Sequence, residues 1–257
     1  MVTLSYTDTL QGTMERQTSL KESKYFDCKC ERCKDPTELG TNFSSLRCPK
    51  CDKGFLLPKN SLDASSPWSC RNSRCESIEI STDVLSITQK IRNEMEGIGE
   101  GNIKIWEDFL RKHENVLHPN HHILTKVKIS LSQMYGKVPN YIIDEMSLEQ
   151  LQRKINLCQD VLKLTDVFEP GLSRIRGVTL YELHAPLLLY AIKTFHSGSS
   201  NKELLKRRLR EVVGCLEDAR RILSFEDPSS AEGKILSTIE NALKETKTWD
   251  TQLKNLR

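Results

Sequence analysis

The sequence lacks a long apolar run, a secretory start and a strong excess of charge of either sign. Its longest apolar stretch, residues 187–192, is far shorter than the roughly 20 residues that a membrane-spanning helix needs. The first eleven residues have neither the basic start nor the apolar segment of a signal peptide. The net charge is only +3, whereas nucleic-acid-binding domains are usually markedly basic. We therefore expect a cytoplasmic or nuclear protein that binds neither a membrane nor nucleic acid directly.

Cysteine, by contrast, is concentrated in one part of the chain. Seven of the nine cysteines lie between residues 28 and 75. In a reducing compartment, clustered cysteines bind metal more often than they form disulfides. The first group is Cys28-x-Cys30-x-x-Cys33, which offers three thiolates. A closed zinc site needs four ligands, and all six histidines lie at position 113 or later, so the fourth ligand must come from elsewhere.

The second cysteine group has the spacing of a four-thiolate zinc ribbon. Cys48-x-x-Cys51 is separated by 18 residues from Cys70-x4-Cys75, and Gly54 suits a tight turn after the first pair. We expect a structural zinc that stabilises a segment too small to build a core, with nucleic-acid contact as the less favoured alternative. Basic residues beside the ligands would offset part of the negative charge on this site: Lys50, Lys53, Arg71 and Arg74.

From residue 83 onward, apolar residues recur with the period of a helix. We predict seven helices. The first two cover residues 83–96 and 103–117, and the third carries Ile123 to Met134 and ends near Gly136. The others begin at Ser147, run through Leu180 to Leu187, and begin at Ser200 and at Ser229. Three capping boxes mark starts: Ser147-x-x-Gln150, Ser200-x-x-Glu203 and Ser229-x-x-Glu232. Pro186 should bend or interrupt the fifth helix. Helix pairs with short connections indicate a mainly α fold with a tetratricopeptide-like (TPR-like) helical array.

Several shorter features complete the pattern. Residues 2–6 have the composition of a β-strand, and residues 10–24 that of a short helix. The last predicted helix carries Trp249 and Leu253 on its apolar face. Cys158 and Cys215 also fall on apolar faces, so we expect them to be buried packing residues.

His118, His121 and His122 have no cysteine or acidic cluster beside them, and we expect them at a helix start on the surface rather than at a metal.

Three stretches carry a resemblance to a known family. Leu4-Ser5-Tyr6-x-Asp8, followed by Tyr25-Phe26-x-Cys28-x-Cys30-x-x-Cys33, resembles the end of the SET domain and the post-SET cysteine knot of SMYD-type protein-lysine methyltransferases. The stretch 35–41, with Cys48-Pro49-x-Cys51 and Trp68-x-Cys70, is similar to the arthropod SmydA or msta group. His118-Pro119-Asn120 and Tyr181-Glu182-Leu183-His184 resemble the C-terminal helical domain of SMYD proteins.

The resemblance implies roles for particular residues. Tyr6 would be the catalytic-channel tyrosine that orients the substrate amine. Phe26, with Tyr25, would pack on the adenine of S-adenosylmethionine. The fourth ligand of the knot would be a cysteine of an Asn-His-Ser-Cys motif, which this sequence does not contain, and Lys24 stands where some relatives have an aromatic residue. The implied domains are the truncated end of the SET domain (1–24), the post-SET knot (25–34), the four-cysteine insert (35–82) and the helical domain (83–257).

The expected function also follows from this resemblance. The chain would be a C-terminal fragment of an S-adenosylmethionine-dependent protein-lysine methyltransferase, with a histone or another protein as substrate, and inactive alone. The alternative is a zinc-stabilised helical adaptor or transcriptional co-regulator. We expect one or two zinc ions, with S-adenosylmethionine bound only in a longer protein. The expected partners are proteins or peptides, such as a histone tail or chromatin co-regulators, and the chain should be monomeric.

Overall fold

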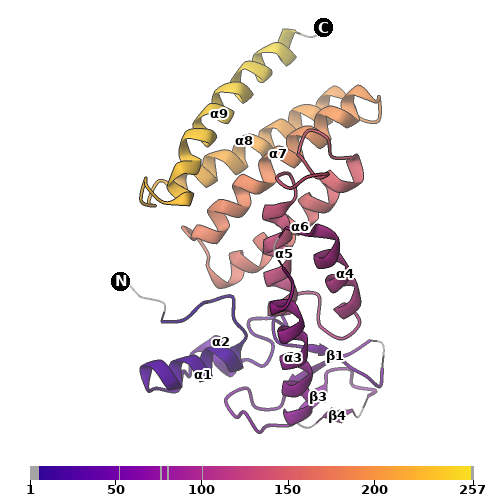
Figure 1. Cartoon of the computed structure of the whole chain (residues 1–257), viewed down its shortest axis with the longest axis vertical. Coiled ribbons are helices and arrows are strands. Elements are labelled where there is room, and N and C mark those ends of the chain that lie inside the picture. Colours follow the sequence, from indigo (N-terminus) through magenta and orange to yellow (C-terminus); the bar gives the residue numbers. More distant parts are fainter. Residues whose placement is uncertain (1–5, 52, 76, 80, 100, 256–257) are drawn as a thin grey trace. The chain divides into compact units, whose positions relative to one another are not determined.

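The structure, a computed structural model, describes residues 6–255 apart from positions 52, 76, 80 and 100, and the side chains of the last helix only to residue 246. Within these residues it has nine helices and four short strands, so the mainly α fold predicted from the sequence is confirmed (Figure 1). The chain divides into two compact units, residues 1–127 and 128–257. The domain boundaries inferred from the motifs stay a prediction.

Some expectations fall on parts of the chain that are not described. Residues 2–5 of the expected strand lie outside the described residues, and Tyr6 lies in a bend. The side chains of Trp249 and Leu253 also lie outside them. None of the described helices combines the length and apolar character that a membrane crossing requires.

The first unit contains a small antiparallel sheet in the order β1-β2-β3-β4. The strands are β1 (Leu46–Arg47), β2 (Phe55–Pro58), β3 (Trp68–Cys70) and β4 (Ile78–Glu79). Leu46 pairs with Leu56, Leu56 with Cys70, and Ser69 with Ile78. The β1–β2 and β3–β4 connections therefore lie at the same end of the sheet, and both carry cysteines.

Two helices precede this sheet and three follow it. The first two are α1 (Thr13–Lys24) and α2 (Glu31–Lys34). The others are α3 (Ser81–Glu96), α4 (Ile103–His113) and α5 (His122–Met134), and α5 crosses the boundary between the units. The predicted helix over 103–117 ends at residue 113 because the next residues pair with β1: Leu46 bridges Leu117, and the Arg47 N–H donates to the Val116 carbonyl at 2.7 Å.

The start of α5 is buried against the loop that leads into β1. The His122 N–H donates to the Phe43 carbonyl at 2.8 Å, and Phe43 is fully buried. His121 is 0% exposed and His122 is 8% exposed. The prediction of a helix start was therefore correct, but the prediction that these two histidines lie on the surface was wrong. Long-range pairing with residue 43 covers them, and no local pattern encodes that pairing.

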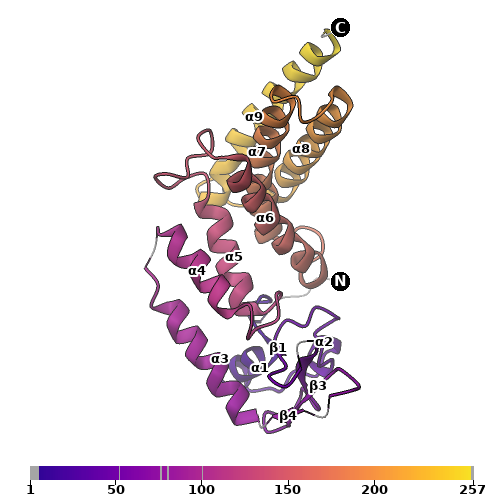
Figure 2. The ribbon, with the colours of Figure 1, turned by 90° about the vertical axis from the view of Figure 1, so that its right-hand side faces the viewer.

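The second unit is an array of four long helices, in which each packs on the one before it (Figure 2). They are α6 (Leu148–Phe168), α7 (Arg174–His196), α8 (Lys202–Leu223) and α9 (Ala231–Asn255). Cys158 and Cys215 lie in the shared core with Leu183, Leu216 and Ile239, as predicted. Gly177 permits close contact between α7 and α8, because a Cβ there would lie 2.8 Å from Ile222.

The helix starts and the proline show where local signals succeed and fail. The Ser147–Gln150 capping box is present at the start of α6. The other two boxes were wrong by one residue: Asn201 caps α8, and Ser230 Oγ accepts from the Gly233 N–H near the start of α9. Of the two effects expected of Pro186, an interruption of the helix was wrong, while a bend stays a prediction. That proline is buried inside a continuous α7, where packing offsets the missing backbone donor.

Candidate metal centres

The four cysteines of the second group lie in the two turns at one end of the sheet. Cys48 and Cys51 lie in the β1–β2 turn, and Cys70 and Cys75 flank the β3–β4 turn. Their Sγ atoms all lie within 4.8 Å of one another. The antiparallel register brings the two pairs together, because it places residue 70 beside β2. The predicted grouping of these residues is thus present in the fold.

The distances between the sulfurs fit a tetrahedral zinc site. The Sγ atoms of Cys48 and Cys75 are 3.7 Å apart, and those of Cys51 and Cys70 are also 3.7 Å apart. Zinc–sulfur bonds of about 2.3 Å in a tetrahedron place sulfurs about 3.8 Å apart. A disulfide would require about 2.05 Å. The group could therefore hold a zinc ion with four protein ligands, which leaves no open position for chemistry.

Peptide and amide N–H groups, rather than basic side chains, face these sulfurs. The Asn72 backbone N–H donates to Cys70 Sγ at 3.4 Å, and its side-chain amide donates to Cys51 Sγ at 3.5 Å. That amide, followed by the Lys53 N–H, lowers the pKa of Cys51 to about 6. Burial alone would raise the pKa of Cys48, but the N–H groups of Lys50 and Cys51 lower it. Such donors stabilise thiolates and orient metal ligands.

Gly54 keeps the space beside the sulfurs open. A Cβ at this position would overlap Cys70 Sγ and would lie 3.1 Å from both Cys51 Sγ and the Asn72 Cβ. The Gly54 carbonyl also accepts from the Cys48 N–H at 2.9 Å, which closes the turn. The sequence suggested a glycine for turn flexibility, whereas the structure gives it a steric role. The sulfurs pack where a side chain would otherwise be.

The first cysteine group is gathered around the short helix α2. Cys30 precedes this helix, Cys33 lies within it, and the three Sγ atoms of Cys28, Cys30 and Cys33 lie within 4.8 Å of one another. Burial acts to raise the pKa of Cys30, but the Cys33 N–H and the Cys28 side chain lower it to about 7. Burial raises the pKa of Cys33 to about 12. The group could hold zinc through three thiolates.

A buried ion pair holds α2 in place. Arg32 and Glu38 are 8% and 2% exposed, and Arg32 Nη2 lies 2.8 Å from Glu38 Oε2. Arg32 also donates to the carbonyls of Thr9 and Gln11, and Glu38 Oε1 accepts from the Thr13 N–H at the start of α1. A further hydrogen bond, which Ser61 Oγ donates to the Cys33 carbonyl at 2.7 Å, joins the three-cysteine group to the four-cysteine insert.

Arg16 of α1 adds a buried positive charge near the three-cysteine group. It is 9% exposed, and its charge acts to lower the pKa of both Cys30 and Cys33, against the larger effect of burial. A cation in this position favours deprotonated thiols, the form that binds metal. Sequence reasoning missed Arg16, Glu38 and Asn72 as supporting residues. Only Asn72, two positions after a ligand cysteine, lies where a knuckle N–H donor could have been anticipated.

The aromatic residues form an exposed surface next to this knot. The rings of Tyr6 and Phe26 lie 6.2 Å apart in an edge-to-face arrangement. Tyr6 is 60% exposed and Phe26 is 42% exposed. Tyr25, with a positive φ of 59° after α1, is 89% exposed. The fold thus brings Tyr6 to Phe26 and leaves all three rings accessible, while their catalytic and cofactor-binding roles stay predictions.

Comparison with known proteins finds relatives among SET domain-containing proteins. The chain is 38% identical over 79 residues to the SET domain-containing protein SmydA-8, isoform B, of Drosophila melanogaster, and 37% identical over 79 residues to isoform A. These matches cover 30% of this chain but only 17% and 16% of the relatives' own length. No family model matches the chain. The similarity confirms the predicted resemblance to SMYD-type SET domain proteins.

Proposed function

We propose that this chain, which is related to SET domain-containing SMYD proteins, takes part in S-adenosylmethionine-dependent methylation of protein lysines. The observation that carries the proposal is the Tyr6–Phe26 pair, whose rings lie 6.2 Å apart beside the three-cysteine knot. In the SMYD methyltransferases that these residues resemble, the tyrosine orients the substrate amine and the aromatic ring packs on the adenine. The substrate would be a histone tail or another lysine-bearing protein.

Zinc would be a structural element of this assembly. Cys48, Cys51, Cys70 and Cys75 would hold one ion, and Cys28, Cys30 and Cys33 would contribute to a second. Four-coordinate zinc of this kind supplies cross-linking rather than reaction chemistry. The first site would fix the ends of four very short strands, and the second would fix the backbone two residues after Phe26. Each would order a segment that has little core of its own.

For S-adenosylmethionine, the chain offers stacking surfaces. Phe26 and Tyr25 both present accessible rings, which fits contact with a planar base. When bound, this cofactor supplies the transferable methyl group. The part of the chain would be to hold the adenine and, through the Tyr6 hydroxyl, to orient the amine. Because orientation carries much of such catalysis, and the 257 residues contain no Asn-His-Ser-Cys motif, we expect no methyl transfer from these residues alone.

The test is methyl transfer by the longest form of the protein that cells express. Radiolabelled S-adenosylmethionine would be supplied with a histone mixture, and Tyr6→Phe would be compared with the wild type. Losing the hydroxyl should lower kcat by about 100-fold or more, in the range for groups that act on the reacting centre. Tyr141→Phe, which changes a tyrosine of the second unit, is the matched control. Equal rates for Tyr6→Phe and wild type would contradict the proposed role.

A second function, that of a helical adaptor, is favoured by a hollow in the second unit. This hollow of about 170 Å³ is lined by residues of α7, α8 and α9, including Leu188 and Leu216, and by the acidic Asp144 and Glu245. Such a surface suits a peptide with apolar and basic side chains. Binding of a histone-tail peptide by the 257-residue chain, with no methyl transfer from any longer form, would favour the adaptor.

A further inference from the structure

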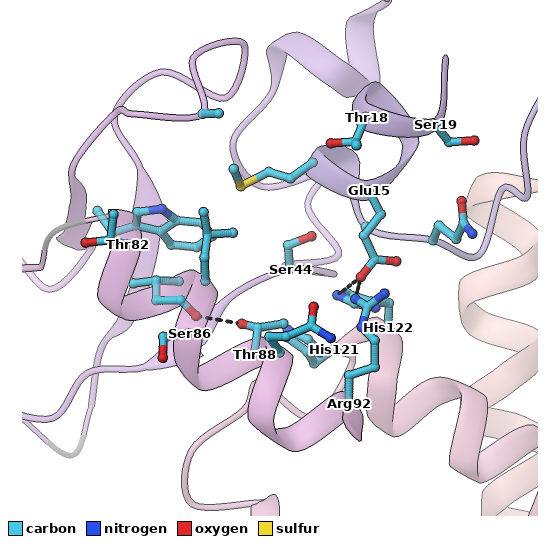
Figure 3. Close-up of a pocket in the computed structure, with 18 of the residues that line it drawn as sticks. Glu15, Thr18, Ser19, Ser44, Thr82, Ser86, Thr88, Arg92, His121 and His122 are labelled. Carbon is cyan, nitrogen blue, oxygen red and sulfur yellow. Dashed lines mark hydrogen bonds and ion pairs between the residues drawn. The ribbon is translucent and has the colours of Figure 1, made fainter. Parts of the chain in front are cut away.

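The first unit contains a large pocket that neither the zinc sites nor the aromatic pair explain. Its volume is about 990 Å³, a size typical of ligand sites. Residues of α1 and α3 line it, together with His121, which precedes α5, and His122, the first residue of α5 (Figure 3). Its lining mixes apolar side chains with hydroxyl groups, among them Met14, Thr18, Val84, Leu85 and Thr88.

His121, one of the residues that line this pocket, carries a buried hydrogen-bond donor. The residue is 0% exposed, and its Nδ1 accepts from the Ile123 N–H at 3.2 Å. Burial, helped by the charges of His118 and Arg92, lowers its pKa to about 3, so the ring is neutral near pH 7. A neutral imidazole that accepts at Nδ1 carries its proton on Nε2. Among the described residues, that Nε2 has no partner.

Arg92 presents a second donor of the same kind. Its Nη2 pairs with Glu15 of α1, as Figure 3 shows, while its Nε is buried and has no partner within the described part of the chain. A buried N–H without an acceptor destabilises a fold by the cost of its desolvation. Both residues line the same pocket, so acceptor atoms bound beside them would offset this cost.

The charges around the donors disfavour an anion as the source of those acceptors. Arg92 already pairs with Glu15, and Glu15 Oε1 also lies 3.5 Å from His122 Nε2. Glu22 adds a further negative charge to the lining. A carboxylate or phosphate would enter beside these two glutamates, whereas an uncharged carbonyl would meet the donors without that repulsion.

We propose that this pocket binds an uncharged ligand with an apolar body, whose carbonyl oxygens accept from His121 Nε2–H and Arg92 Nε–H. Met14, Val84 and Leu85 would contact the apolar part. An amide satisfies this chemistry, either in a small molecule or in the main chain of a bound protein segment. The site does not depend on methyl transfer, so it goes beyond the proposed function and can fail independently of it.

The direct test is a titration of the zinc-loaded chain, labelled with ¹⁵N in histidine and followed by NMR. N-acetyl-leucinamide would be compared with 4-methylpentanoate and isopentylamine, which have a similar apolar body and opposite charges. We expect the amide to shift the His121 Nε2 signal and to bind more tightly than both ions. Tighter binding of the acid, or no shift of His121 with the amide, would overturn the proposal.

Substitution of His121 tests whether its Nε2 donor, and not the local structure of the chain, is responsible for binding. His121→Asn keeps an acceptor for the Ile123 N–H and a favoured residue at the start of α5, but it removes the Nε2 donor. Affinity for the amide should fall by roughly three- to tenfold, as expected for one neutral hydrogen bond. His196→Asn, at an exposed histidine of the other unit, should leave it unchanged. Equal affinity in His121→Asn and wild type would refute the assignment.

A second variant and a longer ligand complete the test. Leu85→Trp fills the pocket from a partly exposed wall position and leaves both donors in place, so it should abolish amide binding even if His121→Asn misfolds. Undiminished binding in Leu85→Trp would place the ligand elsewhere and overturn the proposal. Tighter binding of N-acetyl-Ala-Leu-Ala-amide than of the single amide would identify a protein segment as occupant. Equal binding would identify a small amide.

Discussion

At the residue scale, the four-cysteine site depends on what surrounds the sulfurs as much as on the cysteines. Asn72 donates to two of them from one residue, at 3.4 and 3.5 Å. Gly54 leaves the volume into which the Cys70 sulfur packs. Basic side chains, which the sequence places beside the ligands, are exposed, whereas the peptide N–H groups of Lys50 and Lys53 face the thiolates. The local backbone therefore sets the electrostatics of this site.

Gly54→Ala tests this account of the site. The added Cβ would overlap Cys70 Sγ, so the sulfur must move and the tetrahedron must distort. We expect zinc affinity to fall by at least about tenfold, as for other changes that displace metal ligands. Competition with a chromophoric chelator measures it. Gly99→Ala is the matched control, because a Cβ at Gly99 meets nothing within 4 Å. Equal zinc affinity in the two variants would contradict the steric role of Gly54.

At the element scale, apolar periodicity and capping residues predicted where the helices lie, but not which of their residues other segments bury. The seven helices from α3 to α9 were all expected, because each has an apolar face of its own. Where two neighbouring residues can both cap, as with Ser200 and Asn201, local sequence does not decide between them, and packing does. The burial of His121 and His122 follows from pairing with residue 43, so sequence analysis could not anticipate it.

The second unit also contains a buried ion pair that sequence analysis did not identify. Lys154 of α6 and Glu182 of α7 have side chains that are 4% and 5% exposed, with Nζ and Oε2 2.8 Å apart. Lys154 Nζ also donates to the Tyr135 carbonyl at 2.6 Å. Both residues are charged, so the helical pattern of the sequence predicts them at exposed positions. The pair is visible only once α6 and α7 are packed together.

Glu182→Gln should destabilise the second unit strongly, because it leaves the Lys154 charge buried without its counter-ion. We expect the free energy of unfolding to fall by about 3–5 kcal/mol, the cost of breaking a buried pair from one side. Urea unfolding followed by circular dichroism measures it. Asp108→Asn, which breaks the exposed Asp108–Arg111 pair, should cost about 0.5 kcal/mol or less. A Glu182→Gln loss no larger than that of Asp108→Asn would show that the pair is not buried in solution.

At the scale of the whole molecule, two small cysteine groups and a helical array share one chain. Cysteine spacing predicted both groups. The three-cysteine group lies within six residues, and the two pairs of the four-cysteine group are brought together by the pairing of β2 with β3. Sequence alone could not predict the pocket in the first unit, because one donor comes from α3, the other from His121 just before α5, and the acidic partner of Arg92 from α1. The similarity to SmydA-8 of Drosophila melanogaster extends over 79 residues of the chain.

Zinc content per chain, measured by native mass spectrometry, shows whether both cysteine groups bind metal. We expect two zinc ions in the wild type, with Cys48→Ser removing one and Cys30→Ser removing the other. Sulfurs 3.7 Å apart in the four-cysteine group, and three more thiols within 4.8 Å of one another at the knot, fit that result. A chain that carries no zinc, or whose zinc content is unchanged by Cys48→Ser, would contradict it.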